Sequence, residues 1–395
     1  MSLLPVAEAQ ARLLALAEPL PIETVQLLSA VGRWAADDVL ARRDQPSHDL
    51  SAMDGYAIRY AERPGPWTVV GESAAGAGLN RLLGPYEAAR IFTGAPMPDG
   101  ADSVLVQEEA SRDDDRLLMS GEGPLRAGGN VRPRATDFAL GARLIAVGQR
   151  ISARDVALVG IGGHGMLPVR RLPRVTLVST GDELVPLGEP TPGAKLPASN
   201  AAMLAALLAG KPATVSDKGI VPDDLDLIAD AFRAAASEAD IIVTTGGVSV
   251  GDRDLVRPAL EEAGAKLDFW RVAMRPGKPL LAGRLGNAIV LGLPGNPVSS
   301  YVTASVFLLP LIARMGGAAA PLPAPRAVTL GAPLPANGIR QDYLRARIEN
   351  GRAFAPDGQD SAALAALAAA DGLIVRAPHA PPAAAGETAE MLPLD

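Results

Sequence analysis

The stretch ADIIVTTGGVSVGDRD, residues 239–254, decides the fold that we predict for this sequence. Its first half is an apolar run rich in β-branched residues, which predicts a buried strand over 240–245. A glycine pair and hydroxyl side chains follow, and a helix is predicted over 253–263. A strand that enters a glycine-rich turn and then a helix is a common phosphate-binding layout. The stretch nevertheless lacks a lysine and carries Asp252 and Asp254, which would repel an anion.

The residues on either side repeat this alternation of strand and helix. RVTLVST (174–180), ATVSDKGIV (213–221) and AIVLGL (288–293) predict three further strands. Helices are predicted over 200–210, with Asn200 as N-cap and Gly210 just past the end, over 223–236, and from about Asn296 onward. Strands and helices that alternate at this spacing predict a doubly wound, mostly parallel sheet, whose ligands bind beyond the carboxyl ends of the strands.

The rest of the chain follows other patterns. A length of 395 residues predicts about two to four domains. Helical spacing indicates helices within 3–17 and 152–159, whereas short β-prone runs between turn clusters over about 40–142 indicate a small all-β module. The Pro/Ala-rich segment 316–328 predicts a linker, after which a second small β module closes the chain.

Composition narrows the possible functions. A net charge of −7 and an aromatic content of 4% argue against binding to nucleic acid or to anionic membranes. The absence of cysteine excludes disulfides, thiolate metal sites and thiol nucleophiles, and only three histidines occur. Any metal is therefore expected to be a hard cation bound by oxygen. We see no signal peptide, and the apolar stretch 301–315 contains Pro310 and is shorter than the roughly 20 residues of a membrane span, so a cytoplasmic protein is expected.

Three glycine-containing loops leave the carboxyl ends of the predicted strands: STGDEL (179–184), TTGGVSVGDRD (244–254) and GLPGNPVS (292–299). Glycine allows backbone N–H groups to approach a ligand closely, and three such loops on one sheet edge predict a binding site. The alternative is that the glycines only make tight turns. The established P-loop and dinucleotide-binding signatures are absent.

Charged residues near these loops have two interpretations. Arg271, Arg275 and Lys278 place three cations within eight residues of an acidic protein, which suits capture of phosphate or another oxyanion, although a solvated strand edge is the alternative. Carboxylates tolerate phosphates when a cation such as Mg²⁺ lies between them. Several of them could instead be helix caps; the carboxylates are Asp54, Asp137, Asp182, Glu183, Asp223, Asp224, Asp252 and Asp254.

Taken together, SAMDGYA (51–57), RIFTGAPMPDGADSVLVQEE (90–109), RPGKPL (275–280) and the three loops resemble the MoeA family of molybdopterin molybdenumtransferases, to which the E-domain of gephyrin is similar. The resemblance spans nearly the whole chain. It implies an elongated helical domain from 1–40 with 143–172, an inserted β module over 41–142, an α/β molybdopterin-binding domain over 173–318, and a C-terminal β-barrel over 319–395. It also implies a homodimer whose active cleft lies between the β module of one subunit and the α/β domain of the other.

In that family, molybdate is inserted into adenylylated molybdopterin with Mg²⁺, and AMP is released. The resemblance implies catalytic roles for Asp54, Asp137, Glu183 and Asp254, with Asp54, Glu183 and Asp254 also at the metal. Binding of the substrates would use Thr93, Ser179, Thr180, Gly181, Asp182, Asp223, Gly246, Gly247, Ser249, Arg271, Arg275, Lys278, Pro294, Asn296, Arg340 and Ser361. Arg340 is preferred to Arg345. Arginine at 271 and 275 departs from the lysine frequent in relatives, and its planar fork changes how an anion is held.

Two other functions compete with this one. The first is molybdopterin adenylylation, which the α/β domain alone could perform and which would leave the β module idle. The second is a binding or scaffold protein, as gephyrin also is. The presence of Asp54, Asp137 and Asp254 favours an enzyme. A molybdopterin-adenylylating protein and molybdoenzyme maturation factors are the expected partners.

Overall fold

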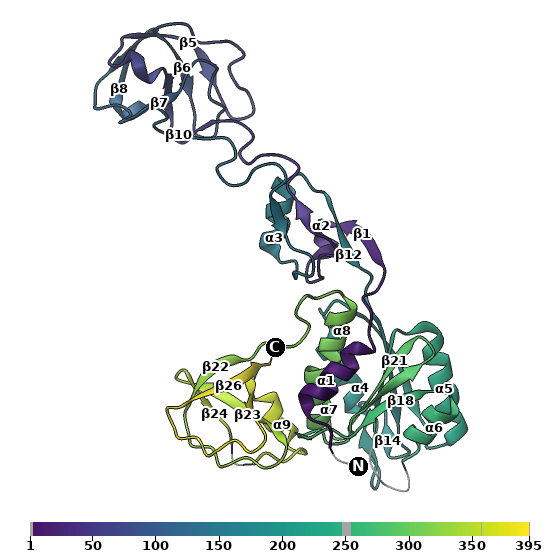
Figure 1. The fold of residues 1–395 in the computed structure, drawn as a ribbon. Coiled ribbons are helices and arrows are strands. Elements are labelled where there is room, and N and C mark those ends of the chain that lie inside the picture. The colour runs from purple at the N-terminus through teal and green to yellow at the C-terminus, as the bar shows by residue number, and fades with distance from the viewer. Residues whose placement is uncertain (1–2, 247–253, 357, 395) are drawn as a thin grey trace.

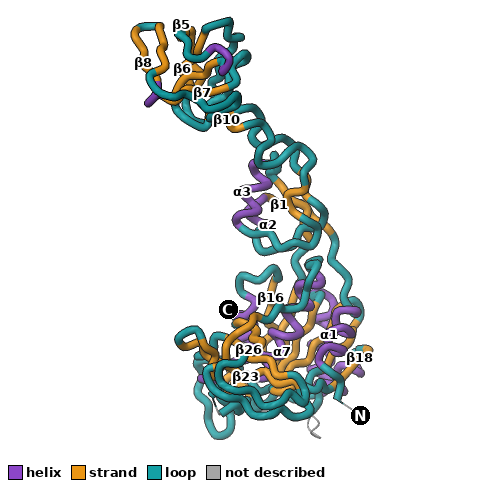
Figure 2. The backbone as a smooth tube through the Cα atoms, turned by 60° about the vertical axis from the view of Figure 1, so that its left-hand side comes forward, coloured by secondary structure: helices purple, strands orange, loops and turns teal. Residues whose placement is uncertain are grey.

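The computed structural model describes residues 3–246, 254–356 and 358–394. The chain is elongated (Figure 1): an α/β domain and a β-barrel lie side by side at one end, a narrow arm leaves them, and a β module stands at the far end of the arm. Figure 2 shows the same separation after a turn of 60°, with strands gathered at both ends and in the arm between them.

The α/β domain is built on a six-stranded sheet, and its mostly parallel, doubly wound character confirms the prediction. Four neighbouring strands pair in parallel, the fifth pairs antiparallel to both of its neighbours, and the sixth closes that edge; the order is β16 (Thr214–Val221), β13 (Arg174–Thr180), β17 (Ile241–Thr245), β21 (Ala288–Leu293), β20 (Leu281–Leu285) and β18 (Lys266–Trp270). Successive residues face opposite sides of the sheet, so Ile241 enters one buried cluster and Ile242 the other. Both faces are therefore covered, as continuous apolar strands require.

Helices cover the two faces of this sheet. They are α4 (Ser199–Leu208), α5 (Leu225–Glu238), α6 (Val256–Glu262), α7 (Pro297–Thr303), a π-helical turn η3 (Ala304–Leu308) and α8 (Leu309–Met315). Asp224 caps α5 by accepting a hydrogen bond from the Leu227 N–H at 3.0 Å. The predicted N-cap Asn200 is wrong: α4 begins one residue earlier, and the Asn200 amide donates to the Gly295 carbonyl at 2.7 Å. The Asn200 side chain thus binds a partner that is distant in sequence, although the local sequence pattern predicted that it would cap the helix.

The segment from α7 to α8 is one continuous helical run, so Pro310 does not end it. The π-helical turn directly before α8 widens the helix, and proline at the start of α8 accompanies that turn. The run Pro297–Met315 is long and apolar enough to cross a membrane, yet most of it is buried inside the protein. Burial of this kind is usual for the core helix of a folded domain.

The β module contains a six-stranded sheet around the buried side chain of Trp67. Its order is β7 (Ser103–Val106), β4 (Gly55–Ile58), β6 (Glu87–Ile91), β5 (Trp67–Ser73), β9 (Arg116–Met119) and β8 (Ala110–Asp113). A short pair joins β3 (Leu50–Ser51) to β10 (Val131–Arg132), and two 3₁₀ turns complete the module, η1 (Tyr60–Glu62) and η2 (Gln107–Glu109).

The arm consists of two short antiparallel pairs and two helices. These elements are β1 (Ile22–Gln26) with β12 (Met166–Arg170), β2 (Val39–Leu40) with β11 (Arg143–Ile145), α2 (Leu27–Ala30) and α3 (Ala153–Ile161). Ser152 and Asp155 form a capping box at the start of α3. The N-terminal helix α1 (Val6–Ala15) differs from the predicted grouping of 1–40 with the arm, because Val6, Ala9 and Leu13 are buried in the α/β core.

The C-terminal unit is a small closed barrel, as predicted. Its strands are β22 (Arg326–Leu330), β23 (Gln341–Glu349), β24 (Arg352–Phe354), β25 (Gly372–Arg376) and β26 (Thr388–Pro393), with α9 (Leu364–Ala368) between β24 and β25. The pairing of β23 with both β24 and β25 closes the barrel. The short strand β19 (Met274–Arg275) leaves the α/β domain and pairs in parallel with β23.

Candidate functional site

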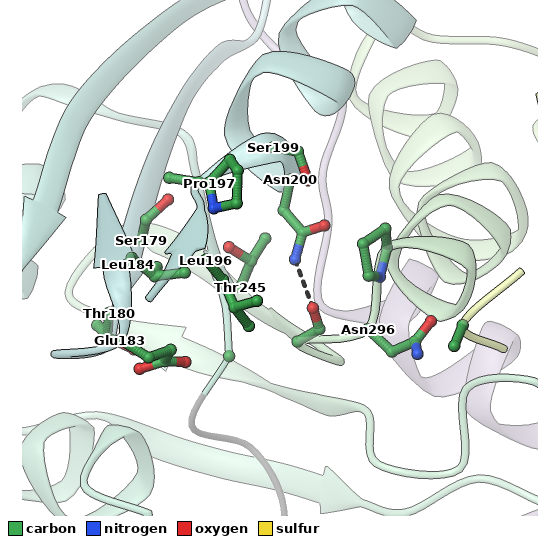
Figure 3. A pocket seen from close by; sticks show the side chains of 15 residues that line it. Ser179, Thr180, Glu183, Leu184, Leu196, Pro197, Ser199, Asn200, Thr245 and Asn296 are labelled. Carbon is green, nitrogen blue, oxygen red and sulfur yellow. Dashed lines mark hydrogen bonds between the residues drawn. The ribbon is translucent and has the colours of Figure 1, made fainter. Parts of the chain in front are cut away.

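A cavity of about 290 Å³ lies at the carboxyl ends of β13, β17 and β21, where the three loops were predicted to converge. We call it the strand-end pocket; Figure 3 shows side chains from all three loops turned toward it. The short pair β14 (Leu184–Val185) and β15 (Leu196–Pro197) forms one wall. The lining residues are Ser179, Thr180, Glu183, Leu184, Leu196, Pro197, Ala198, Ser199, Asn200, Thr245, Gly246, Gly295, Asn296, Pro297 and Ala362.

Glycines allow the loops to pack at this edge. Gly246 has a φ of +89°, and a Cβ there would lie 3.1 Å from the Thr180 carbonyl oxygen. A Cβ at Gly295 would lie 3.3 Å from the Gly246 Cα, so the second and third loops touch backbone to backbone. At Gly181 the Glu183 carboxylate fills the space that a Cβ would take. The glycines therefore serve close loop packing, the structural role that was the alternative to ligand binding, and they also shape the cavity.

Asparagine side chains fix the third loop. The Asn296 side-chain oxygen accepts from the Val298 N–H at 3.1 Å and caps α7, while Asn200 holds the Gly295 carbonyl from the other side. Pro294, directly before them, is buried. These bonds leave the Asn296 amide group at the cavity wall, where it can serve a ligand (Figure 3).

Two of the predicted carboxylates hold neighbouring loops together. The Asp182 N–H donates to Asp223 Oδ2 at 3.2 Å, and the Asp223 N–H donates to Asp182 Oδ1 at 3.1 Å. Lys195 also donates to the Asp182 carbonyl. Neither aspartate lines the strand-end pocket, whereas the exposed Glu183 does.

A second cavity, of about 450 Å³, contains most of the predicted cations. It is lined by Leu3, Arg275, Lys278, Asn337, Gly338, Ile339, Arg340 and Asp342, and we call it the basic pocket. The loop that carries Arg275 and Lys278 lies between β18 and β20, whose paired ends Trp270 and Leu281 stand beside the carboxyl end of β21. Both pockets are thus at the same edge of the sheet.

The parallel pairing of β19 with β23 brings the barrel to this edge. Arg275 stands opposite Asp342 in that ladder, and Arg340 directly precedes β23. Arg345, the rejected alternative, is 2% exposed and donates to Gln359 and to the Ala363 and Gly358 carbonyls. Ser361 neighbours Ala362, which lines the strand-end pocket.

Arg271 stands apart from the other cations. Its φ is +85°, and its guanidinium lies 4.5 Å from the centroid of the Trp270 ring, which Arg257 also approaches at 5.1 Å. Arg271 lines neither pocket. A planar guanidinium stacks on an indole ring better than a lysine ammonium does. The contact with Trp270 therefore explains why position 271 carries arginine.

Asp54 directly precedes β4 in the β module, and this module stands at the other end of the arm from the α/β domain that carries both pockets (Figure 1). Its Oδ1 accepts from the Thr93 N–H at 2.7 Å and from the Thr93 hydroxyl at 2.8 Å. Both bonds lower the pKa of Asp54, and the bond from the Thr93 N–H has the larger effect. The carboxylate is therefore ionised. Asp137 is exposed on the ribbon that joins the module to the arm, where its N–H donates to the Gln45 carbonyl at 2.9 Å.

One chain does not assemble the predicted metal site. Across residues 3–246, 254–356 and 358–394, no three His, Asp or Glu side chains lie close enough to hold a metal ion. Asp254 is half-buried and lies two residues before α6. Gly247, Ser249 and Asp252 lie outside the described residues.

Sequence reasoning missed Asp342 and Asn337. Asn337 donates to the carbonyls of Arg340, Arg376 and Ala377 and shapes the wall of the basic pocket. In the sequence, Asp342 could have been noticed as an acidic residue at the start of a predicted β segment, two positions after Arg340.

Known families match the chain in three consecutive parts. They are the MoeA N-terminal region (domain I and II) over residues 4–162, a probable molybdopterin binding domain over 176–314, and the MoeA C-terminal region (domain IV) over 327–394. Together they match most of the chain.

Individual proteins agree with these matches. The molybdopterin molybdenumtransferase of Nostoc sp. is 39% identical over 75% of this chain and 70% of its own length, and that of Haemophilus influenzae is 36% identical over 76% and 74%. Gephyrin of Dictyostelium discoideum is 31% identical, over 75% of this chain and 47% of its own length. A solved molybdopterin biosynthesis moeA protein from Pyrococcus horikoshii superposes with a TM-score of 0.86 at 26% identity and full coverage of both chains.

Proposed function

Because the chain belongs to the MoeA family of molybdopterin molybdenumtransferases, we propose that it transfers molybdenum from molybdate to molybdopterin in the synthesis of the molybdenum cofactor. The observation that carries this proposal is the pairing of two different pockets at one sheet edge. The basic pocket offers three cationic side chains, and the strand-end pocket offers hydroxyl, amide and apolar groups.

The two pockets suit the two substrates. Molybdate is a tetrahedral dianion, and Arg275, Lys278 and Arg340 supply the charge-assisted donors that such an anion needs. A planar pterin or adenine ring fits the mixed lining of the strand-end pocket. Ser179, Thr180 and Asn296 provide groups for its polar edge or for a phosphate.

The substrate form that we propose is adenylylated molybdopterin, from which AMP leaves. Water cleaves the phosphoanhydride bond, so AMP leaves and molybdopterin keeps its own phosphate. The two thiol groups of the pterin then bind molybdenum, and one molybdate oxygen leaves as water with the two thiol protons. Because both sulfur ligands come from the pterin, the protein needs no cysteine. The chain's own part is positioning and charge: its cations hold molybdate beside the pterin and offset the negative charge that develops as the bond to AMP breaks.

We propose that the complete site forms between two subunits. Asp54, Thr93 and Asp137 are far from the pockets of their own chain, and the arm holds the β module outward where a second molecule could receive it. Large apolar side chains exposed along the arm favour such an assembly, among them Leu28 at 81% and Met166 at 50%. The proposed Mg²⁺ requirement depends on this assembly, because Asp54 of the partner subunit would have to join Glu183 and Asp254.

Cytoplasmic action follows from this proposal, since the substrate and the product are handed between proteins. A molybdopterin-adenylylating protein would supply the substrate, and maturation factors of molybdoenzymes would receive the cofactor. The strongly acidic balance of the chain suits such a partner better than nucleic acid.

The reaction is tested by incubating the purified chain with adenylylated molybdopterin, molybdate and Mg²⁺. We expect AMP release that depends on molybdate. Transfer of AMP from ATP to molybdopterin without molybdate would establish adenylylation instead. Binding of molybdopterin without any turnover, at every molybdate concentration, would favour a scaffold.

The shared site is tested by mixing two variants, Asp54→Ala and Lys278→Ala, at a molybdate concentration low enough that Lys278→Ala alone shows no turnover. Random re-pairing of equal amounts makes half of the dimers mixed, and each mixed dimer has one intact site, so about a quarter of the wild-type activity should return. A site within one chain predicts no recovery, because each chain keeps its own defect. Size measurement by light scattering is the control for re-pairing.

A further inference from the structure

One carboxylate stands among the cations of the basic pocket. Asp342 lines this pocket together with Arg275, Lys278 and Arg340, and it also lines an adjoining cavity of about 260 Å³. Its residue is only 7% exposed. An ionised acid at the wall of an anion pocket repels the ligand that the cations attract, so its presence needs a reason.

The strand order places Asp342 between two arginines without hydrogen-bonding it to either. Arg275 on β19 and Arg376 on β25 stand opposite it on the two sides of β23. The nearest Arg275 nitrogen is 3.7 Å from Asp342 Oδ2, and the Arg376 guanidinium donates instead to the carbonyls of Pro335 and Pro381. Within the described part of the chain, no donor reaches the Asp342 carboxylate at hydrogen-bond distance.

Asp240, which is buried to a similar degree, shows how hydrogen-bond donors change the pKa of a buried carboxylate. Asp240 is 8% exposed, and its carboxylate accepts hydrogen bonds from Arg171 and Arg174 that outweigh its burial and lower its pKa to about 2. At Asp342, burial raises the pKa, and the charges of Arg275 and Arg340 offset it only in part. Burial without a hydrogen-bond donor thus favours the protonated form of Asp342, in contrast to Asp240.

We propose that Asp342 takes up one proton from solvent when a dianionic oxyanion enters the basic pocket, and that the neutral carboxyl group donates its O–H to that oxyanion. The inference rests on the proposed function in that molybdate is the oxyanion. Uptake leaves the three cations without an opposing carboxylate and gives the ligand one more donor. Asp342 would thus act as a selectivity residue for fully deprotonated oxyanions.

Selectivity follows from the hydrogen-bond inventory. Molybdate at neutral pH carries only acceptor oxygens, so it needs the protonated acid. Hydrogen phosphate brings its own O–H, which an ionised Asp342 can accept without any proton uptake. The two ligands are therefore distinguished by the protons that binding consumes.

Titration calorimetry of the full chain with sodium molybdate tests this inference. Measurement at one pH in two buffers of different ionisation heat gives the number of protons taken up. We expect uptake approaching one proton in mildly acidic buffer, and a Kd that rises with pH by at most about tenfold per pH unit. Asp342→Asn should bind molybdate with no proton uptake and little pH dependence.

The matched control is Glu349→Gln, an exposed acid at the other end of the same strand, which should keep the wild-type proton count. Since removal of a buried acid can disturb the barrel, the wild-type chain provides a second test that needs no variant. It should take up more protons with molybdate than with phosphate, and equal uptake would overturn the inference.

The failures of the two proposals are distinguishable. Molybdate binding without proton uptake, or uptake that persists in Asp342→Asn, refutes the role of Asp342 and leaves the transferase proposal intact. If the chain ignores molybdate but binds sulfate with an uptake that Asp342→Asn abolishes, the role of Asp342 stands and the assignment of molybdate fails.

Discussion

Replacement of Asp240 by asparagine should loosen the joint between the arm and the α/β sheet. Asp240 directly precedes β17, and its carboxylate accepts from the Arg171 guanidinium at 2.8 and 2.9 Å and from the Arg174 N–H at 2.8 Å. Arg171 lies on the connection from β12 of the arm to β13 of the sheet. The variant therefore removes a charge that fixes the point where the arm begins.

The magnitude follows from the pKa of Asp240. Its fall from 3.8 to about 2 corresponds to roughly 2.5 kcal/mol of stability at neutral pH. The Arg171 and Arg174 side chains are 34% and 51% exposed, so they can regain water in the variant. Asparagine also keeps an acceptor for the Arg174 N–H. We therefore expect a loss of about 2 kcal/mol, below the 3–5 kcal/mol typical of a fully buried broken pair.

The pH dependence has a definite sign. Because the folded-state pKa is lower than the unfolded one, the contribution of Asp240 is complete above about pH 4 and disappears as the pH falls through about 2. The stabilities of the wild type and of Asp240→Asn should differ at neutral pH and converge in strong acid.

The assay is urea unfolding followed by tryptophan fluorescence. The three tryptophans lie in different units, Trp34 in the arm, Trp67 in the β module and Trp270 in the α/β domain, so a variant that keeps Trp270 alone reports on the relevant domain. Asp230→Asn is the matched control, because its pair with Arg233 is exposed and worth at most about 0.5 kcal/mol. Equal losses in the two variants, or a difference that persists unchanged in acid, would refute the reasoning.

Four further outcomes are expected. Asp54→Ala should keep the circular dichroism spectrum of the wild type but abolish molybdate-dependent AMP release; unchanged turnover would remove Asp54 from the site. Lys278→Ala should weaken molybdate binding in calorimetry by about tenfold or more, since a charge-assisted contact is lost. Gly246→Ala should destabilise the α/β domain by roughly 1–2 kcal/mol in urea unfolding, because φ is +89° and the new Cβ meets Thr180, and a neutral result would contradict the tight packing of the loops. Chelation of Mg²⁺ should stop AMP release and restored Mg²⁺ should recover it, whereas release that continues in excess chelator would count against a metal requirement.

The sequence predicts the four parallel strands of the α/β sheet because their signals are local, whereas β20 and β18 were not predicted. Apolar runs such as 240–245 and glycines such as Gly246 determine strands and turns from their own neighbours, and parallel strands then bring their carboxyl ends to one edge. Glu183 and Asn296 accordingly line the strand-end pocket as expected. The local pattern gives a wrong prediction where a contact with a residue distant in sequence determines the structure. Asn200 donates to the Gly295 carbonyl instead of capping α4, and α1 packs into the core of the α/β domain instead of joining the arm.

The basic pocket illustrates the limit most clearly. Arg275 and Lys278 form an evident cluster in sequence, but their partner Asp342 arrives through a ladder between strands that are far apart in the chain. Nothing in the spacing of either segment indicates that pairing, because β-ladder partners are chosen by tertiary packing. Arg271 belongs to the same cluster in sequence, yet its backbone turns at positive φ and its guanidinium stacks on the Trp270 ring instead of lining the basic pocket.

The barrel is part of the site, although a Pro/Ala linker suggested a separate module. Tyr343, Leu373 and Leu392 from the barrel belong to the same buried cluster as Leu291 and Phe307 of the α/β domain. A ladder of two residue pairs would be weak alone, but this shared apolar core holds β23 against β19 and so keeps Arg340 and Asp342 at the cations of the other domain. The glycine-rich loop at 246–254 has acidic residues where a phosphate loop usually has a lysine; the positive charge at this edge comes instead from Arg275 and Lys278 of the α/β domain and from Arg340, which the inter-domain contact adds. An α/β domain without the barrel would keep the strands and glycines of the strand-end pocket as well as Arg275 and Lys278, but it would lose Arg340 and Asp342 from the basic pocket and Ala362 from the strand-end pocket.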